Sequence, residues 1–106
     1  MVFVETSAFT KYLPGCLSDD EYGLLQKHLV EHSDAGDLIR GSGGCRKIRW
    51  ASRGKGKRGG VRVIYYWAGS KDQIYLLTIY GKSEKGDLTP DDLKRVKASL
   101  EEIENG

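Results

Sequence analysis

The sequence predicts an α+β fold in which N-terminal helices pack on a small antiparallel β-sheet and a further helix follows at the C-terminus. Three observations lead to this class. Residues 19–32 repeat apolar side chains at helical spacing, residues 46–80 contain three segments rich in β-branched and aromatic residues, and residues 90–103 show a second helical period. With 106 residues the chain has room for one hydrophobic core, so we expect a single domain over residues 1–106.

Short elements are expected before the first long helix. Residues 2–4 are a β-prone run, and residues 7–13 predict a short helix that the Pro-Gly pair at positions 14 and 15 ends. Ser18 and Glu21 have the spacing of a capping box, which predicts a helix from about residue 19. The glycine-rich residues 34–44 are expected to connect this helix to the sheet.

The second half of the chain predicts three strands and a final helix. Residues 46–52, 61–67 and 73–80 are separated by glycine- and lysine-rich connections, so an antiparallel meander is the simplest arrangement. Apolar residues fall on both faces of the third segment, which indicates a central strand. Thr89 is placed to cap the last helix, and Pro90 suits its first position.

Positive charge is concentrated in the middle of the sequence. The formal net charge is only +2, but residues 38–71 contain no Asp or Glu and many Lys and Arg. A domain that segregates its positive charge in this way presents a local field to a polyanion. The composition, 39% hydrophobic and 30% charged, is typical of a folded protein and argues against disorder.

The predicted first hairpin of the meander arranges its cations on one face. In an extended strand Lys47 and Arg49 point to one side, Ile48 and Trp50 point to the other, and Arg62 on the next strand can lie beside the cations. The loop between these strands is too polar and too rich in glycine to be core, so it should project further cations. The residues expected to contact RNA phosphates are Arg46, Arg53, Lys55, Lys57 and Arg58.

Aromatic residues accompany this charge in the second and third strands. They are Tyr65, Tyr66, Trp67, Tyr75 and Tyr80. Such rings can stack on unpaired bases, although most aromatic residues in strands belong to a core. Basic and aromatic side chains interleaved on a sheet suit single-stranded RNA better than duplex DNA, which favours an inserted helix.

Three segments, taken in chain order, resemble the RelE superfamily of bacterial toxins. They are residues 47–52 (KIRWAS), 62–66 (RVIYY) and 76–84 (LLTIYGKSE). The long Gly-Lys-rich loop and the Tyr80-Gly81-Lys82 ending are similar to its HigB branch. The resemblance covers nearly the whole chain. It implies a RelE-like fold and a toxin of a type II toxin–antitoxin system that cleaves mRNA in the ribosomal decoding site. It also implies a cognate antitoxin, which for the HigB branch is a HigA-like helix-turn-helix protein.

The resemblance also implies which residues act. Lys47, Arg49 and Arg62 match catalytic cations of the family, and Lys82 matches a basic residue that follows a glycine. Ser83 stands where the family pattern has a later arginine, and no tyrosine follows near residue 87. Tyr80 or Lys82 is therefore expected to take the missing role.

Cleavage of RNA by its own 2′-OH needs a base, stabilisation of charge on the phosphate, and an acid for the leaving 5′-oxygen. The basic stretch contains neither His nor a carboxylate. Lys47 is the candidate base, since neighbouring positive charges disfavour a protonated ammonium. Arg49 and Arg62 would stabilise the transition state. No metal and no cofactor is expected.

Other functions stay open. His28, Glu31 and His32 match the H-x-x-E-H pattern of some metalloproteases, with Glu101 or Glu102 as a further ligand, but a five-residue match on a surface helix is weak. Two solvent-facing histidines are expected instead. A ParE-like toxin that inhibits gyrase through protein contacts and a noncatalytic RNA- or ribosome-binding module are the remaining alternatives.

The location expected from the sequence is the cytoplasm. No apolar run approaches the roughly 20 residues that a membrane helix needs, and the N-terminus does not read as a signal peptide. Cys16 and Cys45 are expected to be reduced, partly buried thiols.

Overall fold

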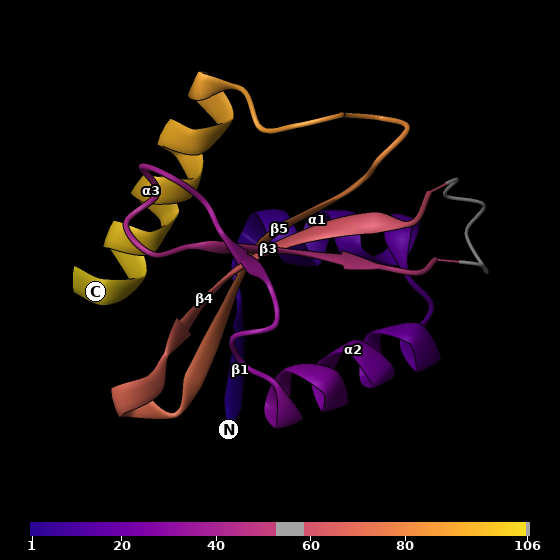
Figure 1. Ribbon diagram of the computed structural model, residues 1–106, viewed down its shortest axis with the longest axis horizontal. Helices are drawn as coiled ribbons and strands as arrows, with labels where there is room; N and C mark the ends of the chain where they lie inside the picture. The colour runs from indigo at the N-terminus through magenta and orange to yellow at the C-terminus, as the bar shows by residue number, and fades with distance from the viewer. Residues whose placement is uncertain (53–58, 106) are drawn as a thin grey trace.

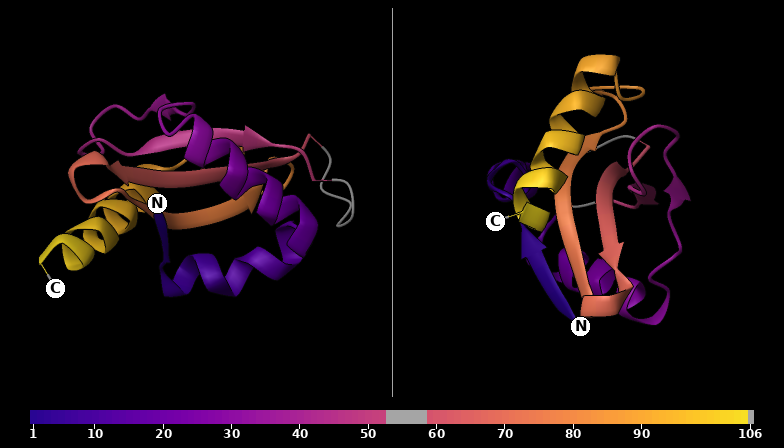
Figure 2. Two further views of the ribbon diagram at one scale, coloured as in Figure 1. Left: turned by 90° about the horizontal axis from the view of Figure 1, so that it is seen from below. Right: turned by 90° about the vertical axis from the view of Figure 1, so that its left-hand side faces the viewer.

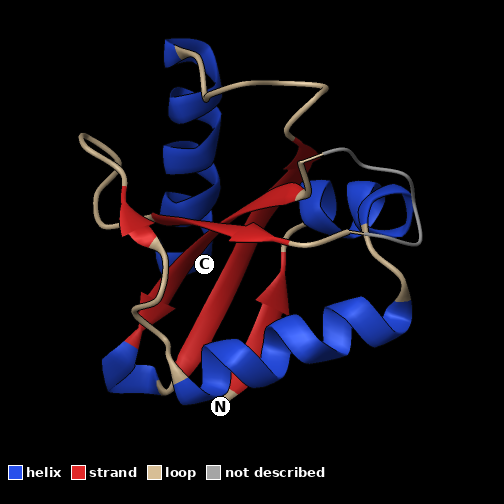
Figure 3. Cartoon of the chain, turned by 45° about the vertical axis from the view of Figure 1, so that its right-hand side comes forward, coloured by secondary structure: helices blue, strands red, loops and turns tan. Residues whose placement is uncertain are grey.

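A five-stranded sheet with the strand order β1-β5-β4-β3-β2 organises the computed structural model, which describes residues 1–52 and 59–105 (Figures 1 and 3). In chain order the elements are β1 (Val2–Glu5), α1 (Ser7–Cys16), α2 (Asp19–Glu31), β2 (Asp37–Leu38), β3 (Arg46–Trp50), β4 (Val61–Ala68), the 3₁₀ turn η1 (Gly69–Lys71), β5 (Gln73–Gly81) and α3 (Pro90–Asn105). The predicted α+β class is confirmed.

The predicted meander is confirmed for β3, β4 and β5, which pair antiparallel in sequence order. The pairing of β4 with β5 is interrupted by one irregularity, a register shift between Ile64 and Tyr65. The prediction of a purely antiparallel sheet is wrong at one edge, because β1 pairs parallel to β5. A parallel pair needs a long crossover, and α1, α2 and the remaining strands supply it.

Two hydrophobic clusters fill the two faces of the sheet. On one face α1 and α2 bury Phe9, Leu25 and Leu29 against strand residues that include Tyr65 and Leu76. On the other face Val96 and Leu100 of α3 pack on the sheet, and Figure 2 shows α3 alongside β5. β5 contributes buried residues to both clusters, so the predicted central strand is confirmed.

Each helix begins with a side-chain cap. The capping box predicted at Ser18 and Glu21 is present in both directions, with distances of 3.2 Å and 2.9 Å. At α3 the hydroxyl of Thr89 accepts from the backbone N–H of Asp92 at 3.1 Å, which confirms the predicted cap. The side chain of Thr6 caps α1 in the same way. These bonds satisfy N–H groups that a helix cannot pair internally.

Two boundaries differ from those that the sequence predicts. Instead of ending before Pro14, α1 continues to Cys16. Proline removes only its own N–H bond, and near the end of a helix the carbonyl left without a partner belongs to Thr10, an exposed residue. Within the predicted connection 34–44, the two-residue strand β2 pairs with β3 and covers the sheet edge.

The turn between α2 and β2 is fixed to the sheet by two side chains. The buried hydroxyl of Tyr65 donates to the carbonyl of Ser33 and accepts from the N–H of Gly36, each at 2.9 Å. Arg46 donates from Nη1 to the carbonyls of Asp34 and Gly36 at 3.1 Å and 2.8 Å. This contact leaves no room at Gly36, where a Cβ would lie 2.9 Å from the Tyr65 ring and 3.0 Å from the Lys47 carbonyl.

We therefore expect Gly36→Ala to lower the free energy of unfolding by about 1–3 kcal/mol, the usual cost of overpacking a filled site. Gly23→Ala is the matched control, because Gly23 lies inside α2 with nothing within 4 Å of an added Cβ. That substitution should raise the free energy by about 0.5–1 kcal/mol through the lower chain entropy of alanine. Urea unfolding of both variants gives the comparison, and equal effects would contradict this account of Gly36.

Candidate functional site

Three strands place cations and a tyrosine in one row on the α3 side of the sheet. Arg49 on β3 pairs with Arg62 on β4, and Arg62 pairs with Tyr80 on β5. Lys47 lies two residues before Arg49 and therefore faces the same side. Its cross-strand partner Ile64 belongs to the hydrophobic cluster under α3, as Tyr80 does. We call Lys47, Arg49, Arg62 and Tyr80 the cation row. The sequence correctly predicted that Ile48 and Trp50 face the opposite side.

Arg62 is the deepest member of the cation row, with only 4% of its surface exposed. Its Nη1 donates to the carbonyls of Gly59 and Val61 at 3.3 Å and 3.4 Å. Lys47 is partly exposed and Arg49 is exposed. Exposure to solvent therefore increases along the row from the buried guanidinium of Arg62 to Lys47 and Arg49. An anion on the surface can contact Lys47 and Arg49 directly.

A carboxylate from a distant part of the sequence lies in this positive field. Asp87 accepts from Nζ of Lys47 at 2.9 Å. This hydrogen bond and the charge of Lys47 lower the pKa of Asp87, and the charges of Arg62 and Arg49 add to the effect. Asp87 is therefore ionised at neutral pH. It also offsets the positive charge around Lys47 on which the hypothesis of a lysine base depends.

The segment 82–89 carries Asp87 from the end of β5 to the start of α3 (Figure 1). Lys85 of this segment pairs with Asp92 of α3 at 3.0 Å, and its Nζ lies 5.7 Å from the centre of the Tyr80 ring. The N–H of Thr89 and Lys85 hold the pKa of Asp92 at about 2. Among the described residues, an ion pair to Lys47 attaches the segment to the sheet and another to Asp92 attaches it to α3.

The hydroxyl of Tyr80 is buried, and among the described residues it has no hydrogen-bond partner. Burial raises the pKa of Tyr80, and Asp87 raises it further while Arg62 opposes the change. The hydroxyl therefore stays protonated at neutral pH and keeps a proton to donate. A pocket of about 500 Å³ between α1, β5 and α3 adjoins the site, since Tyr80 and Lys85 line it.

Not every residue predicted for the site lies in the cation row. Arg46 faces the other side of β3, where it fixes the turn after α2. Lys82 lies beyond the end of β5, its backbone N–H donates to the carbonyl of Gly60 at 3.2 Å, and its side chain runs beside Gly59. Four predicted phosphate contacts lie outside the described residues. These are Arg53, Lys55, Lys57 and Arg58.

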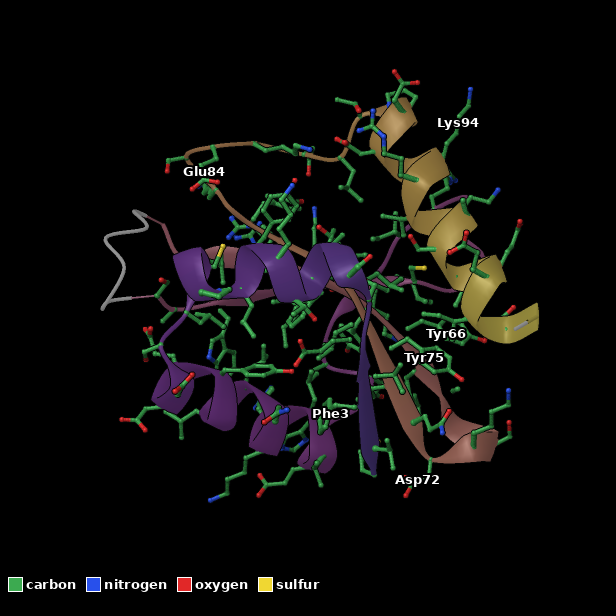
Figure 4. All side chains as sticks on the ribbon, turned by 180° about the vertical axis from the view of Figure 1, so that it is seen from behind. Phe3, Tyr66, Asp72, Tyr75, Glu84 and Lys94 are labelled. Atoms are coloured by element: carbon green, nitrogen blue, oxygen red, sulfur yellow. The ribbon has the colours of Figure 1, made fainter. Side chains whose placement is uncertain are left out.

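Most of the aromatic residues serve the core, as the sequence suggested. Tyr65 belongs to the cluster under α1 and α2. The rings of Tyr66 and Tyr75 stack with centroids 6.1 Å apart near the C-terminal end of α3 (Figure 4). Trp67, 40% exposed, lies near the β4–β5 turn. Tyr80 is the aromatic residue of this set that shares the cation row.

Of the two histidines at the end of α2, His28 packs against the sheet. The His28 ring lies 5.2 Å from that of Trp50 and 5.2 Å from that of His32, so His28 is half-buried and the expectation of two solvent-facing histidines is wrong for it. Within residues 1–52 and 59–105 no three His, Cys, Asp or Glu side chains gather as a metal site would require. Both cysteines are buried, where the sequence predicted partly buried thiols. Across the same described ranges, no helix is long and apolar enough to cross a membrane.

No family model matches the sequence. Two solved structures have a similar fold, each with a TM-score of 0.55. A mutant of the E. coli toxin RelE in the free state shares 18% identity over 80% of this chain and 86% of its own. The intact E. coli RelBE toxin–antitoxin complex provides a chain with 20% identity, over 79% of this chain and 98% of its own. The chain has a RelE-like fold. The fold expected from the resemblance is confirmed.

Within this RelE-like fold, sequence reasoning missed Asp87 and Lys85 as residues of the site. Lys47 and Asp87 are 40 residues apart in the sequence, and no motif with a fixed spacing connects them. Asp87 stands just before the Thr-Pro start of α3, where it reads as part of a helix cap. The available signal is weak. It is an acid on the connection that must cross the cationic face to reach the last helix.

The ion pair predicts how Asp87 titrates in the RelE-like fold. Its folded pKa lies below the usual 3.8, so the pair contributes above that value and is lost as pH falls through the folded pKa. Lys47→Met should raise the Asp87 midpoint toward 3.8, which carboxyl-carbon NMR can follow. Lys27→Met, which removes an exposed cation of α2, should leave the midpoint unchanged. An unchanged midpoint in Lys47→Met would refute the contact.

Proposed function

We propose that this chain is the toxin of a type II toxin–antitoxin system and that it cleaves mRNA on the ribosome without a metal ion of its own. The observation that carries the proposal is the cation row, where Lys47, Arg49 and Arg62 meet a tyrosine whose hydroxyl has no hydrogen-bond partner in the part of the chain that the structure describes. The RelE-like fold supports the toxin assignment, since both structural neighbours are described as a toxin or a toxin–antitoxin complex. The resemblance to the HigB branch is retained as part of the proposal.

The roles follow from burial and charge. Lys47 and Arg49 bind the scissile phosphate from the accessible side, and Arg62 stabilises the extra negative charge from below. In the reaction the 2′-oxygen passes its proton to a solvent water and bonds to phosphorus while the bond from phosphorus to the 5′-oxygen breaks. Tyr80 donates its proton to that leaving oxygen, because its raised pKa keeps it protonated until then. We assign Lys47 to binding the phosphate and not to the role of general base, because Asp87 offsets the positive charge around it.

The proposal includes a cognate antitoxin, for which the RelBE complex is the structural precedent. From the HigB resemblance we propose a HigA-like protein with a helix-turn-helix domain. The ribosome and its mRNA are the other partners, which places the chain in the cytoplasm. Lys82 is kept as a further candidate at the end of the site nearest Gly59 and Gly60.

Cleavage by purified protein tests the function. Wild-type chain added to programmed ribosomes should cut the mRNA at sites that primer extension maps, and Lys47→Met should slow the cut by about 100-fold or more, as loss of one charge-stabilising group does elsewhere. Lys27→Met should cut at the wild-type rate, because Lys27 lies on α2 away from the cation row. Intact mRNA together with inhibited DNA supercoiling by gyrase would favour the ParE-like alternative.

Binding should depend strongly on salt. If several phosphates are neutralised, the affinity for a single-stranded oligoribonucleotide falls as salt rises, with a logarithmic slope of about −0.7 for each phosphate contacted. Lys47→Met should make the slope shallower by about one contact, and Lys27→Met should not change it. Titrations at three or more salt concentrations give the slopes. A flat response in the wild type would remove the electrostatic basis of the proposal, and binding without any cleavage would indicate a noncatalytic module.

A further inference from the structure

The cation row already holds one anion. Lys47 donates to the Asp87 carboxylate at 2.9 Å, and Arg62 and Arg49 are close enough to lower the pKa of the same group. Positive charge from two neighbouring strands therefore converges on a single carboxylate. That carboxylate resembles the two non-bridging oxygens of a phosphodiester, since in both groups two oxygens share one negative charge.

The carboxylate is held loosely. The side chain of Asp87 is 81% exposed, and that of Lys47 is 27% exposed. Asp87 belongs to the 82–89 segment, which contains neither helix nor strand. Exposed ion pairs contribute little to stability, so a stronger anion can replace this one.

The other attachments of the segment do not pass through Asp87. Lys85 is paired with Asp92, and Thr89 and Asp92 form the cap of α3. The backbone N–H groups of Glu84 and Lys85 donate to the carbonyl of Gly81, which fixes the start of the segment. Asp87 lies between these two fixed ends, so it can leave Lys47 without unfolding either of them.

We propose that Asp87 is an intramolecular competitor for the phosphate site, and that a substrate phosphate binds between Lys47, Arg49 and Arg62 by displacing its carboxylate. The inference rests on the proposed function for the identity of the substrate. It adds a residue that sets the affinity of the phosphate site and that neither the sequence pattern nor the fold assigns.

The competitor lowers the affinity of the site for every anion. Each anion must give up part of its binding energy to displace Asp87, whether it is inorganic phosphate or RNA. A single phosphate has few other contacts with the protein, so its weak binding becomes weaker still. An RNA strand held at several phosphates, or positioned by a ribosome, still binds after the same loss. Asp87 thus keeps small cellular anions from occupying the site and does not prevent a polyanion from doing so.

Asp87→Asn tests the proposal with two probes. The first is inorganic phosphate, followed by the amide NMR shifts of β3 and β4, and the second is a 2′-O-methyl oligoribonucleotide that cannot be cleaved. We expect the variant to bind both probes at least about threefold more tightly than the wild type, in line with loss of an exposed ion pair and of one repelling charge. The factor should be similar for both probes, because each displaces the same contact.

Asp91→Asn is the matched control, since it removes a nearby exposed acid from the first turn of α3. It should leave both affinities close to those of the wild type. Asp87→Ser, whose side chain is too short to reach Lys47, should bind at least as tightly as Asp87→Asn. In a Lys47→Met background the gain from Asp87→Asn should shrink, because the contact that it releases is already missing.

The outcomes separate this inference from the proposed function. Unchanged or weaker phosphate binding by Asp87→Asn would overturn the inference, even if the wild type cleaves mRNA. An equal gain in Asp91→Asn, or an undiminished gain in the Lys47→Met background, would also overturn it, since the effect would then be one of general charge. Tighter phosphate binding by Asp87→Asn, found in a protein that never cleaves mRNA, would support the inference and reject the proposed function.

Discussion

β5 is packed on both faces, and the positions of the other elements follow from this. Its residues Ile74, Leu76 and Ile79 lie in the cluster under α1 and α2, while Tyr75 and Leu77 lie in the cluster under α3. A strand buried on two sides must have neighbours at both edges to pair its backbone. β4 lies along one edge and β1 pairs with its first half along the other. The candidate site lies toward the end of β5, at Tyr80.

The site combines a buried cation with accessible ones. A guanidinium as deep as that of Arg62 is costly unless its donors find acceptors, and here backbone carbonyls serve. Lys47 and Arg49 avoid the cost by staying nearer the surface. In the proposed function, this gradient would let a phosphate keep part of its hydration while it meets the fixed charge of Arg62. In the structure Asp87 balances the accessible end of this field.

The parts of the fold and site that the sequence predicted are those determined by local pattern. The capping box at Ser18, the cap at Thr89 and the alternation of Lys47 with Ile48 depend on residues close together in the chain, and the structure contains all three. A strand as short as β1 can still be recognised from its β-prone residues. Those residues do not show in which direction the strand pairs, so the parallel pairing of β1 with β5 could not be predicted.

The failures have a common physical origin in tertiary contacts. Strand alternation already puts Arg46 on the face opposite Lys47, but its hydrogen bonds to the carbonyls of Asp34 and Gly36 could not be derived from the sequence. The sequence predicts that His28 is exposed, but in the folded protein Trp50 of β3 packs beside it. Asp87 reads as part of a helix start, and only the path of the 82–89 segment over the sheet brings it to Lys47. Each case depends on a partner that is distant in sequence.

The register shift between β4 and β5 has a consequence for the evolution of this chain. Ile64 pairs with Thr78 and Tyr65 with Leu76, so β5 contains one more residue than its partner at this point, Leu77. The extra residue reverses the inside–outside parity of the strand beyond it, which is why Tyr80 rather than Ile79 stands beside Arg62. Loss of the Leu77 codon would restore regular pairing, because Thr78 would then follow Leu76 directly, as Ile64 directly precedes Tyr65. Tyr80 would keep its place beside Arg62, so the strand absorbs this extra residue without moving the hydroxyl.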